Sequence, residues 1–408
     1  MATGAQPPVP AGLGPYGRDG RVRLALILGA LSAFAPLSID MYLPALPSVA
    51  RTLHSSPSLA QLSLTACLIG LAAGQLLAGP VSDARGRRRP LQAGIAVYAA
   101  ASALCVLAPG IGVLLGLRLL QGFAGAAGIV ISRAIVRDLY DGAEMARFFS
   151  MLVMVNGAAP VFAPLIGAQL LRVTSWRGVF AVLALIGAAL LVVVSRWLPE
   201  SLPPGRRRTG GLRAVAKDGA ALARDRHFSR YALAGGLAFG AMFAYISGSP
   251  FVLEGKFGIS PQLFSLLFAI NGAGIVGAGE LSRRLTGRLT QRKLLTAGLA
   301  GSAAGGAALL VAALTGTGLP LVLPALFVVV ASVGLSLPNS TSLALARHGS
   351  QAGSASAVLG VAQFAIGAAA APLVGVAGPR NDLPMAIVIC VLGVSAWLSR
   401  PRPGRRQS

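Results

Sequence analysis

Charged side chains are absent from long stretches of this chain and gather in short segments between them. Residues 59–79 and 91–108 contain no Asp, Glu, Lys or Arg, whereas the segment that joins them holds four arginines. A helix needs about 20 predominantly apolar residues to cross a bilayer. We therefore predict twelve membrane-spanning helices, at Leu24–Ala45, Leu59–Gly79, Pro90–Ala108, Ile111–Val136, Phe148–Leu171, Trp176–Leu198, Tyr231–Leu253, Leu263–Leu281, Leu294–Leu314, Leu319–Leu343, Ala355–Val376 and Leu383–Leu398.

The composition supports an integral membrane protein. Hydrophobic residues make up 55% of the 408 residues and charged residues 12%, whereas soluble domains carry about 25% charged residues. The net charge of +23 is also found in nucleic-acid-binding proteins, but here the basic residues lie in short loops between apolar spans, so we exclude that class. The three cysteines each fall in an apolar run and predict neither a disulfide framework nor a metal site.

The basic residues indicate the orientation of the chain. With the N-terminus in the cytoplasm, 28 of the 35 Lys and Arg residues, Arg133 among them, fall on the inner side and five on the outer side. Cytoplasmic loops carry an excess of Lys and Arg, and these also suit anionic lipid headgroups. We therefore predict a multi-pass membrane protein with both termini in the cytoplasm, and the excess of Ala, Gly and Arg suggests that the membrane is a bacterial cytoplasmic membrane.

The spans divide into two sets of six. Pro199–Arg230 is the one long predicted connection between spans on the cytoplasmic side, and it is basic. We predict an all-α membrane protein with two six-helix bundles (6+6), a plan that is common among secondary transporters. The predicted parts are an N-terminal tail at 1–23, a bundle at 24–198, the linker at 199–230, a bundle at 231–400 and a C-terminal tail at 401–408.

Two ionisable residues inside the spans are candidates for chemistry. Ionisable groups in a bilayer are costly unless they are paired or hydrated. Asp40 in the first span and Arg118 in the fourth both fall in the predicted outer half of the bilayer, so a direct or water-linked pair is geometrically possible. A carboxylate that alternates between an arginine and an apolar cavity can carry a proton. The alternatives are an anchor or cap for Asp40 and a structural role for Arg118 at backbone carbonyls.

The loop Gly79–Leu91 has a distinctive spacing of glycine and charge. Gly79 and Gly86 permit a tight turn and a close helix approach. Asp83 can cap the next helix or pair with an arginine across the loop. Arg87 and Arg88 can hold neighbouring helix ends together in an outward-facing state. We predict a conformational latch; the alternative is an ordinary basic loop.

The fifth span and a few polar residues complete the list of predicted site residues. Pro160 and Pro164 lie on one helix face and predict a kink, and Gly167 allows close packing; the alternative is a lipid-facing kink with no specific role. A mostly apolar cavity is predicted to draw its polar groups from Tyr42, Gln75, Gln121, Asn156, Tyr245 and Asn271, while Asn339 and Gln363 are further polar groups in spans.

These motifs resemble those of a known transporter family. The loop matches the signature of the major facilitator superfamily, although Ala84 stands where a basic residue is common. Residues 40–47, DMYLPALP, look like the first-helix signature of the Bcr/CflA type of drug-resistance transporter. Further similarity lies at Arg118, Gln121 and Gly122, at residues 133–140 and 163–167, and at Trp176, Arg177 and Phe180.

The resemblance implies a function. Such families export drugs in exchange for protons, with the first-helix acid handling protons or cationic substrate and the fourth-helix arginine coupling the two. We therefore expect a monomeric exporter of small drug-like compounds that uses the proton gradient and no cofactor. An enzyme is excluded because the sequence has no phosphate loop, metal spacing or catalytic triad. A proton-coupled importer of a small metabolite and a non-transporting membrane sensor remain as alternatives.

Overall fold

The computed structural model describes residues 18–207, 221–347, 352–378 and 381–400, nearly all of them helical. The first half contains α1 (Arg18–Ser32), α2 (Phe34–Asp40), η1 (Leu43–Ala45), α3 (Leu46–Thr52), α4 (Pro57–Arg85), α5 (Arg88–Val106), α6 (Ile111–Leu139), α7 (Gly142–Val173) and α8 (Trp176–Trp197). After the short η2 (Pro204–Arg206), the second half contains α10 (Arg226–Pro250), η3 (Phe251–Lys256), α11 (Pro261–Leu285), α12 (Gln291–Thr315), α13 (Leu319–Leu345), α14 (Ala352–Ala370), η5 (Ala371–Gly375) and α15 (Leu383–Ser399). Most of the two predicted tails and part of the linker lie outside the described residues.

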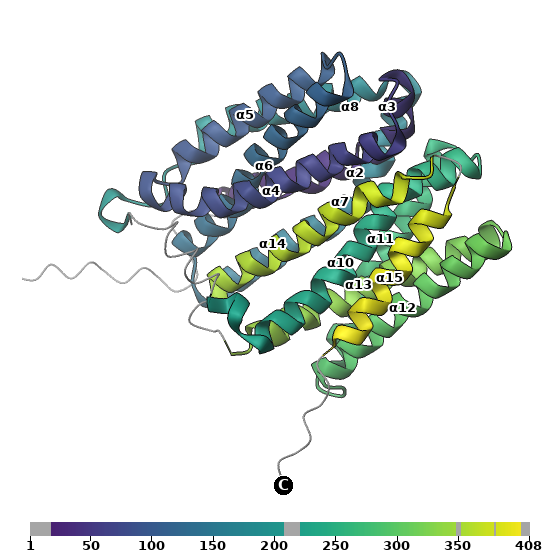
Figure 1. Ribbon diagram of the computed structural model, residues 1–408. Helices are drawn as coiled ribbons and strands as arrows, with labels where there is room; N and C mark the ends of the chain where they lie inside the picture. Colours follow the sequence, from purple (N-terminus) through teal and green to yellow (C-terminus); the bar gives the residue numbers. More distant parts are fainter. Residues whose placement is uncertain (1–17, 208–220, 348–351, 379–380, 401–408) are drawn as a thin grey trace, which may run out of the picture.

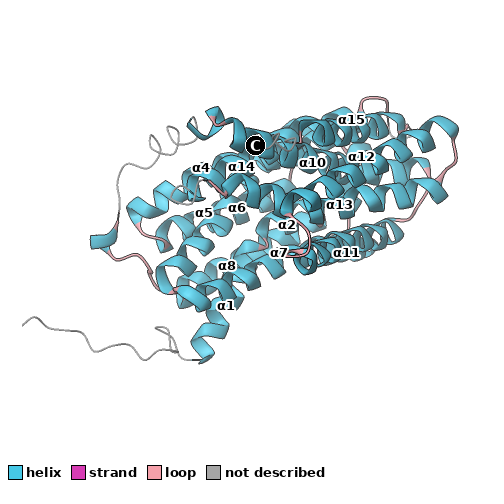
Figure 2. Ribbon diagram, turned by 90° about the horizontal axis from the view of Figure 1, so that it is seen from below, coloured by secondary structure: helices cyan, strands magenta, loops and turns pink. Residues whose placement is uncertain are grey.

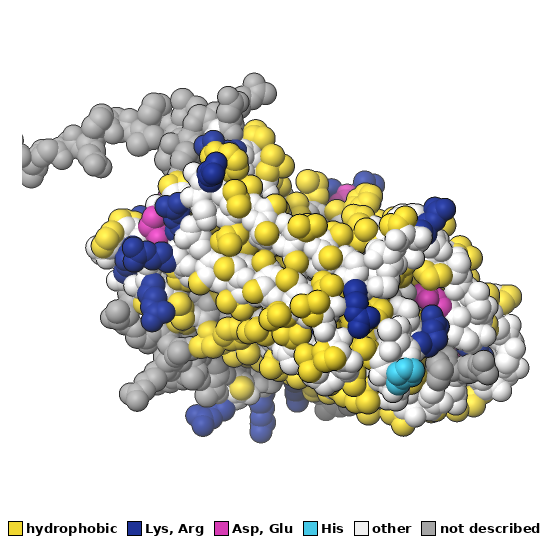
Figure 3. Space-filling model, turned by 90° about the horizontal axis from the view of Figure 1, so that it is seen from above, with side chains coloured by type: hydrophobic (Ala, Val, Ile, Leu, Met, Phe, Trp, Pro, Cys, Tyr) yellow, Lys and Arg dark blue, Asp and Glu magenta, His cyan; other side chains and the backbone are white. Residues whose placement is uncertain are grey.

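These helices confirm the predicted all-α membrane fold. Among the described residues, nine helices are long and apolar enough to cross a membrane, and the bent segment at the start of the chain makes ten. Two shorter apolar helices, Gly157–Val173 within α7 and Leu383–Ser399, correspond to the remaining predicted spans. Figure 3 shows one face in which hydrophobic side chains cover much of the middle, while Lys and Arg gather mostly towards the ends.

The helices form two groups that lie side by side (Figures 1 and 2). Helices α4 and α7 of the first group pack against α14 and α11 of the second. One buried apolar cluster draws side chains from both groups, including Tyr42 and Phe180 on one side and Phe243 and Tyr245 on the other. Two further clusters each belong to one group. Apolar packing therefore joins the two halves over part of their length only.

The first span differs from the single helix predicted over Leu24–Ala45. The helix is interrupted after Ser32, bends by 43° and breaks again after Asp40, and the apolar segment continues to Thr52. Pro36 and Pro44 explain these interruptions, because proline donates no backbone hydrogen bond and its ring clashes with the preceding turn. Asp40 is consequently the last residue of α2, directly before a turn.

The signature loop is also shorter than predicted. Helix α4 continues past Gly79 to Arg85, so Gly79 and Asp83 are helical. The chain turns at Gly86, whose φ of +87° favours glycine, and α5 begins at Arg88. A Cβ on Gly79 would make only an ordinary contact with Val130 at 3.8 Å. Gly86 is therefore the glycine of this signature that the backbone conformation requires.

Candidate functional site

A cavity of about 420 Å³ lies between the two groups of helices. Its walls come from α2, α4, α6 and α7 on one side and from α10, α13 and α14 on the other. Most of the lining is apolar, from Leu68 and Ile129 in the first half to Phe243 and Phe364 in the second. The polar lining consists of Asp40, Gln75, Arg133, Thr341, Ser356 and Gln363. Such a lining suits a small organic molecule that has few polar groups.

Asp40 supplies the acidic side chain of this cavity. The break after α2 places it at the cavity wall, and only 5% of the residue is exposed. No ion pair or hydrogen bond joins Asp40 to another residue in the part of the chain that the structure describes. Its carboxyl group is therefore available to a substrate, a water molecule or a proton.

Arg118 lies in a separate buried site. Its Nη1 donates a hydrogen bond to Gln121 Oε1 at 2.5 Å, and Gln121 Nε2 donates to Ser102 Oγ at 2.7 Å. The guanidinium carbon lies 4.9 Å from the ring centre of Tyr42 and 5.6 Å from that of Phe180. These rings stabilise the cation by cation–π attraction. Nε and Nη2 are buried and lack a hydrogen-bond partner among the described residues.

The structure does not pair Asp40 with Arg118. The ion pairs among the described residues include neither residue, and Arg118 does not line the cavity. The pairing that the sequence allows is thus absent from this conformation. The reason is the break after Asp40, because it lets Tyr42 rather than Asp40 face Arg118.

Arg133 is a cavity residue that the sequence analysis placed on the cytoplasmic surface. It lies within α6, four residues after Ile129, which also lines the cavity, and its side chain is exposed. Residues four apart share a helix face. The sequence carries a signal for this position, because Arg133 is four residues after Ile129 of the fourth span and therefore lies on the same helix face. The cavity therefore carries a fixed positive charge as well as a carboxyl group.

Of the predicted cavity polar groups, the structure places Gln75 in the wall. Tyr245 and Asn271 lie elsewhere and are joined by a hydrogen bond of 2.9 Å from Asn271 Nδ2 to Tyr245 Oη. Tyr42 and Gln121 belong to the Arg118 site instead. Buried polar groups are normally satisfied by hydrogen bonds, which explains why these four point to partners inside the protein. The side chain of Asn156 lies outside the described residues.

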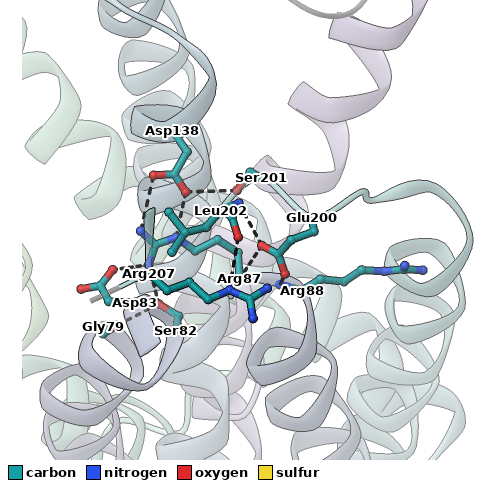
Figure 4. A network of polar contacts seen from close by, with 10 residues as sticks. All are labelled: Gly79, Ser82, Asp83, Arg87, Arg88, Asp138, Glu200, Ser201, Leu202 and Arg207. Carbon is teal, nitrogen blue, oxygen red and sulfur yellow. Dashed lines mark hydrogen bonds and ion pairs between the residues drawn. The ribbon is translucent and has the colours of Figure 1, made fainter. Parts of the chain in front are cut away.

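Arg87 is the centre of a polar network at the linker end of the first half (Figure 4). Its Nε donates to Asp138 Oδ2 at 2.8 Å and its Nη1 donates to Ser82 Oγ at 2.8 Å. Nη1 also forms an ion pair with Asp83. Burial alone lowers the pKa of Arg87, but the hydrogen bonds to Asp138 and Asp83 raise it above its ordinary value. The network therefore holds a charged guanidinium between α4 and α6.

Glu200 caps α5, a role that the sequence analysis considered for Asp83. Its two carboxylate oxygens accept the backbone N–H of Arg87 at 2.7 Å and that of Arg88 at 3.2 Å. A carboxylate at a helix N-terminus satisfies free amides and interacts favourably with the helix dipole. A Cβ on Gly86 would lie 2.5 Å from Glu200 Oε2, so the cap also needs glycine there. The Arg88 side chain donates to the carbonyl oxygen of Ser195.

The prolines of the fifth span do not interrupt it, since α7 is continuous from Gly142 to Val173. Pro160 lines the cavity and lies near Gly272 of α11. A Cβ on Gly167 would lie 2.1 Å from the carbonyl oxygen of Met41. Gly167 therefore allows α7 to approach the broken first span closely, next to Asp40.

Hydrogen bonds between the two halves lie at the end away from the linker. Ser58 Oγ donates to the carbonyl oxygen of Pro372 at 2.6 Å, and Thr65 Oγ1 donates to that of Ala368 at 3.0 Å. Gln61 Nε2 donates to the carbonyl oxygen of Ser247 at 3.1 Å, and Gln262 Nε2 to that of Ala168 at 3.2 Å. These bonds close one end of the cavity.

A comparison with protein families now identifies the chain. The model of the Major Facilitator Superfamily matches residues 28–372. The chain belongs to the Major Facilitator Superfamily. The MFS-type transporter YdgK of Bacillus subtilis is 40% identical over 387 residues, which cover 94% of this chain and 96% of that protein. The Bicyclomycin resistance protein homolog of Haemophilus influenzae is 30% identical over 92% of this chain and 96% of its own length.

A third relative supports the drug-resistance branch of this superfamily. The Chloramphenicol resistance protein of Pseudomonas aeruginosa is 34% identical over 67% of this chain and 64% of its own length. These relatives confirm the similarity to Bcr/CflA-type proteins that the motifs predicted. The protein is thus a multi-pass membrane transporter of the superfamily and not an enzyme.

Solved structures of other transporters share the fold. A bacterial homolog of the human lysosomal transporter Spinster, in an inward-facing and unoccupied conformation, has a TM-score of 0.76 at 16% identity and covers 94% of this chain and 97% of its own. The xylose transporter XylE of E. coli, in a partially occluded inward-open conformation, has a TM-score of 0.70 at 17% identity and covers 93% and 97%. These similarities support the architecture of two helix bundles.

Proposed function

We propose that this transporter exports small, largely apolar drug-like compounds from the bacterial cytoplasm in exchange for protons. The observation that carries the proposal is Asp40, a carboxyl group without an ion-pair partner in the wall of a mostly apolar cavity. A proton and a substrate compete for this group, because a protonated Asp40 no longer attracts a cation or accepts the same hydrogen bonds. Competition for one site is sufficient for exchange.

The orientation of the chain assigns the conformation, and the names of relatives support the direction of transport. The basic loops favour a cytoplasmic linker and cytoplasmic termini in the inner membrane, so the closed end of the cavity faces outward and the present conformation is inward-facing. Asp40 lies near the closed end, where protons arrive once the bundles reverse their tilt. The resistance names of two relatives support export over uptake. Each half rocks as a unit, and one chain suffices for transport.

The Arg87 network is proposed to act in that rocking movement. It joins α4, α6 and the start of the linker at the end where the halves are apart in this conformation. By keeping these elements together it lets the first half move as one body. In the outward-facing state the same loop meets the second half and acts as the latch.

Transport in proteoliposomes tests the proposal. Purified protein is reconstituted with a proton gradient, and uptake of chloramphenicol, bicyclomycin and xylose is measured together with proton flux. We expect wild type to exchange protons for one of the two antibiotics, and Asp40→Asn to lose at least 90% of gradient-driven transport while the protein still binds the compound. Asp141→Asn is the matched control, because Asp141 is an exposed carboxylate that precedes α7.

Other outcomes would overturn the proposal. Full gradient-driven transport by Asp40→Asn would return Asp40 to the role of an anchor. Proton-coupled uptake of xylose in the same direction as the protons would establish an importer. Binding without any flux in the wild type would support a sensor.

A further inference from the structure

A second and larger cavity, of about 800 Å³, lies on the side of the first half and away from the transport cavity. Its lining comes from α4, α5 and α6, so it is a groove bounded by these three helices; Figure 1 shows the three helices next to one another in the first half. Its walls are apolar and include Leu77, Val81, Val97, Leu120 and Phe123. Val97, Leu120 and Phe123 are each about two-fifths exposed, at 39%, 41% and 39%. In a membrane-spanning bundle, exposed apolar side chains of this kind face the acyl chains of lipids.

One end of this groove is strongly basic. Arg85 at the end of α4, Arg89 at the start of α5 and Arg207 of the linker all contribute to its lining. Arg85 and Arg89 are exposed. The ion pairs among the described residues include none of the three.

Arg87 of the same loop has acidic partners, unlike Arg85 and Arg89 in the part of the chain that the structure describes. Arg87 lies between Arg85 and Arg89 in sequence but points into the bundle, where Asp83 and Asp138 neutralise it. Asp83 and Asp138 are thus used by the Arg87 side chain, while Glu200 caps α5 and lies near Arg207. The mouth of the groove is left with three positive charges, at the depth where the apolar wall ends.

We propose that the groove binds one anionic phospholipid of the linker-side leaflet. An acyl chain lies along Leu77, Val97 and Phe123, and the phosphate binds Arg85 and Arg89, with Arg207 closing the site. Basic pockets at the ends of transmembrane helices on this side are suited to anionic headgroups. The planar guanidinium group can donate two parallel hydrogen bonds to phosphate oxygens.

The groove favours a lipid over other occupants. It opens sideways, where the surrounding solvent is the hydrocarbon of the bilayer rather than water, so a lipid reaches it by lateral diffusion. A zwitterionic lipid brings an ammonium group that would meet Arg85 and Arg89, which form no ion pair among the described residues. A soluble ligand such as inorganic phosphate would use the arginines but leave the apolar walls empty.

Native mass spectrometry in detergent tests the proposal. Wild-type protein is incubated with equal amounts of phosphatidylglycerol and phosphatidylcholine, and we expect one molecule of phosphatidylglycerol to be retained preferentially. The double variant Arg85→Gln/Arg89→Gln should bind it about thirtyfold more weakly, since each basic residue contributes on the order of 1 kcal/mol at a membrane surface. The control Arg288→Gln/Arg292→Gln removes two exposed arginines from the linker side of the second half and should leave binding unchanged.

A second pair of variants tests the apolar part of the site. Ala93→Trp places a large ring in the groove, whereas Ala100→Trp places one on the same helix, exposed and beyond the groove. We expect loss of the bound lipid in the first and retention in the second, with equal melting temperatures in lipid-free detergent. Equal retention of both lipids by wild type, displacement by inorganic phosphate alone, or unchanged binding in Arg85→Gln/Arg89→Gln would overturn the proposal.

Discussion

At the scale of single residues, two buried arginines show how differently one side chain can be accommodated. Arg87 is neutralised by Asp83 and Asp138. Arg118 is fully buried and is held by Gln121 and by aromatic faces instead, and no carboxylate contacts it in the part of the chain that the structure describes. An unneutralised charge inside a membrane protein is costly. The arrangement therefore leaves Arg118 available to an anionic partner in another conformation.

Arg118→Lys tests whether this site depends on the shape of guanidinium or on charge alone. Lysine supplies a point charge without the planar fork, so it cannot contact Gln121 and the rings of Tyr42 and Phe180 at once as the guanidinium does. We expect a stability loss of about 2 kcal/mol and at least a tenfold loss of transport. Thermal unfolding in detergent and proteoliposome flux measure these effects. Arg172→Lys, at an exposed arginine, is the control; wild-type flux in Arg118→Lys would contradict the expectation.

At the scale of elements, the first half depends on close contact between α4 and α6. A Cβ on Gly122 of α6 would lie 2.1 Å from the carbonyl oxygen of Cys67 in α4. Small residues let membrane helices approach each other, and the approach is then held by packing rather than by a hydrophobic effect. The same contact places Arg118 and Gln121 on the inner side of α6, within about one turn of Gly122. Helix spacing and the position of the buried arginine are therefore linked.

A comparison of two glycines in α6 tests this contact. Gly122→Ala should lower stability by about 3 kcal/mol, because the added methyl group meets backbone and forces the helices apart. Gly116→Ala should be neutral or stabilising by up to about 1 kcal/mol, because a Cβ there meets nothing within 4 Å and alanine favours helix. Melting temperatures of the purified variants measure the difference. Equal melting temperatures would show that α4 and α6 tolerate a wider separation.

At the scale of the whole molecule, the two halves are joined at one end and separate at the other. A shared apolar cluster and the cross-half hydrogen bonds of Ser58, Gln61 and Thr65 lie away from the linker. Near the linker, each half has its own apolar cluster. This asymmetry is the structural requirement for alternating access, in which one end opens as the other closes.

Cysteine accessibility tests this asymmetry in a variant that lacks the three native cysteines. We expect Gln75→Cys, in the cavity wall, to react with a maleimide added on the linker side faster than Thr65→Cys, which lies at the closed end. Gly205→Cys in the exposed linker identifies that side and should not be labelled from outside intact cells. Faster labelling of Thr65→Cys in the resting protein would contradict the inward-facing assignment.

The sequence by itself determined the spans and the family. A span is recognised from local composition, because hydrocarbon excludes charge wherever it occurs. For the same reason Asp40 and Arg118 stood out without any knowledge of their neighbours. The spacing of Gly86, Arg87 and Arg88 was sufficient to predict a structured turn. The orientation of the spans in the membrane and the coupling of transport to protons remain predictions, because no contact in the structure tests them.

Tertiary structure decided which of these groups meet. The proline-induced breaks turned Tyr42 rather than Asp40 towards Arg118, and Glu200, more than a hundred residues away from the turn, became its cap. Arg133 proved to line the cavity, and the apolar groove between α4 and α5 became visible. Such features depend on the rotation of each helix about its axis, and that rotation is set by packing against segments distant in the chain.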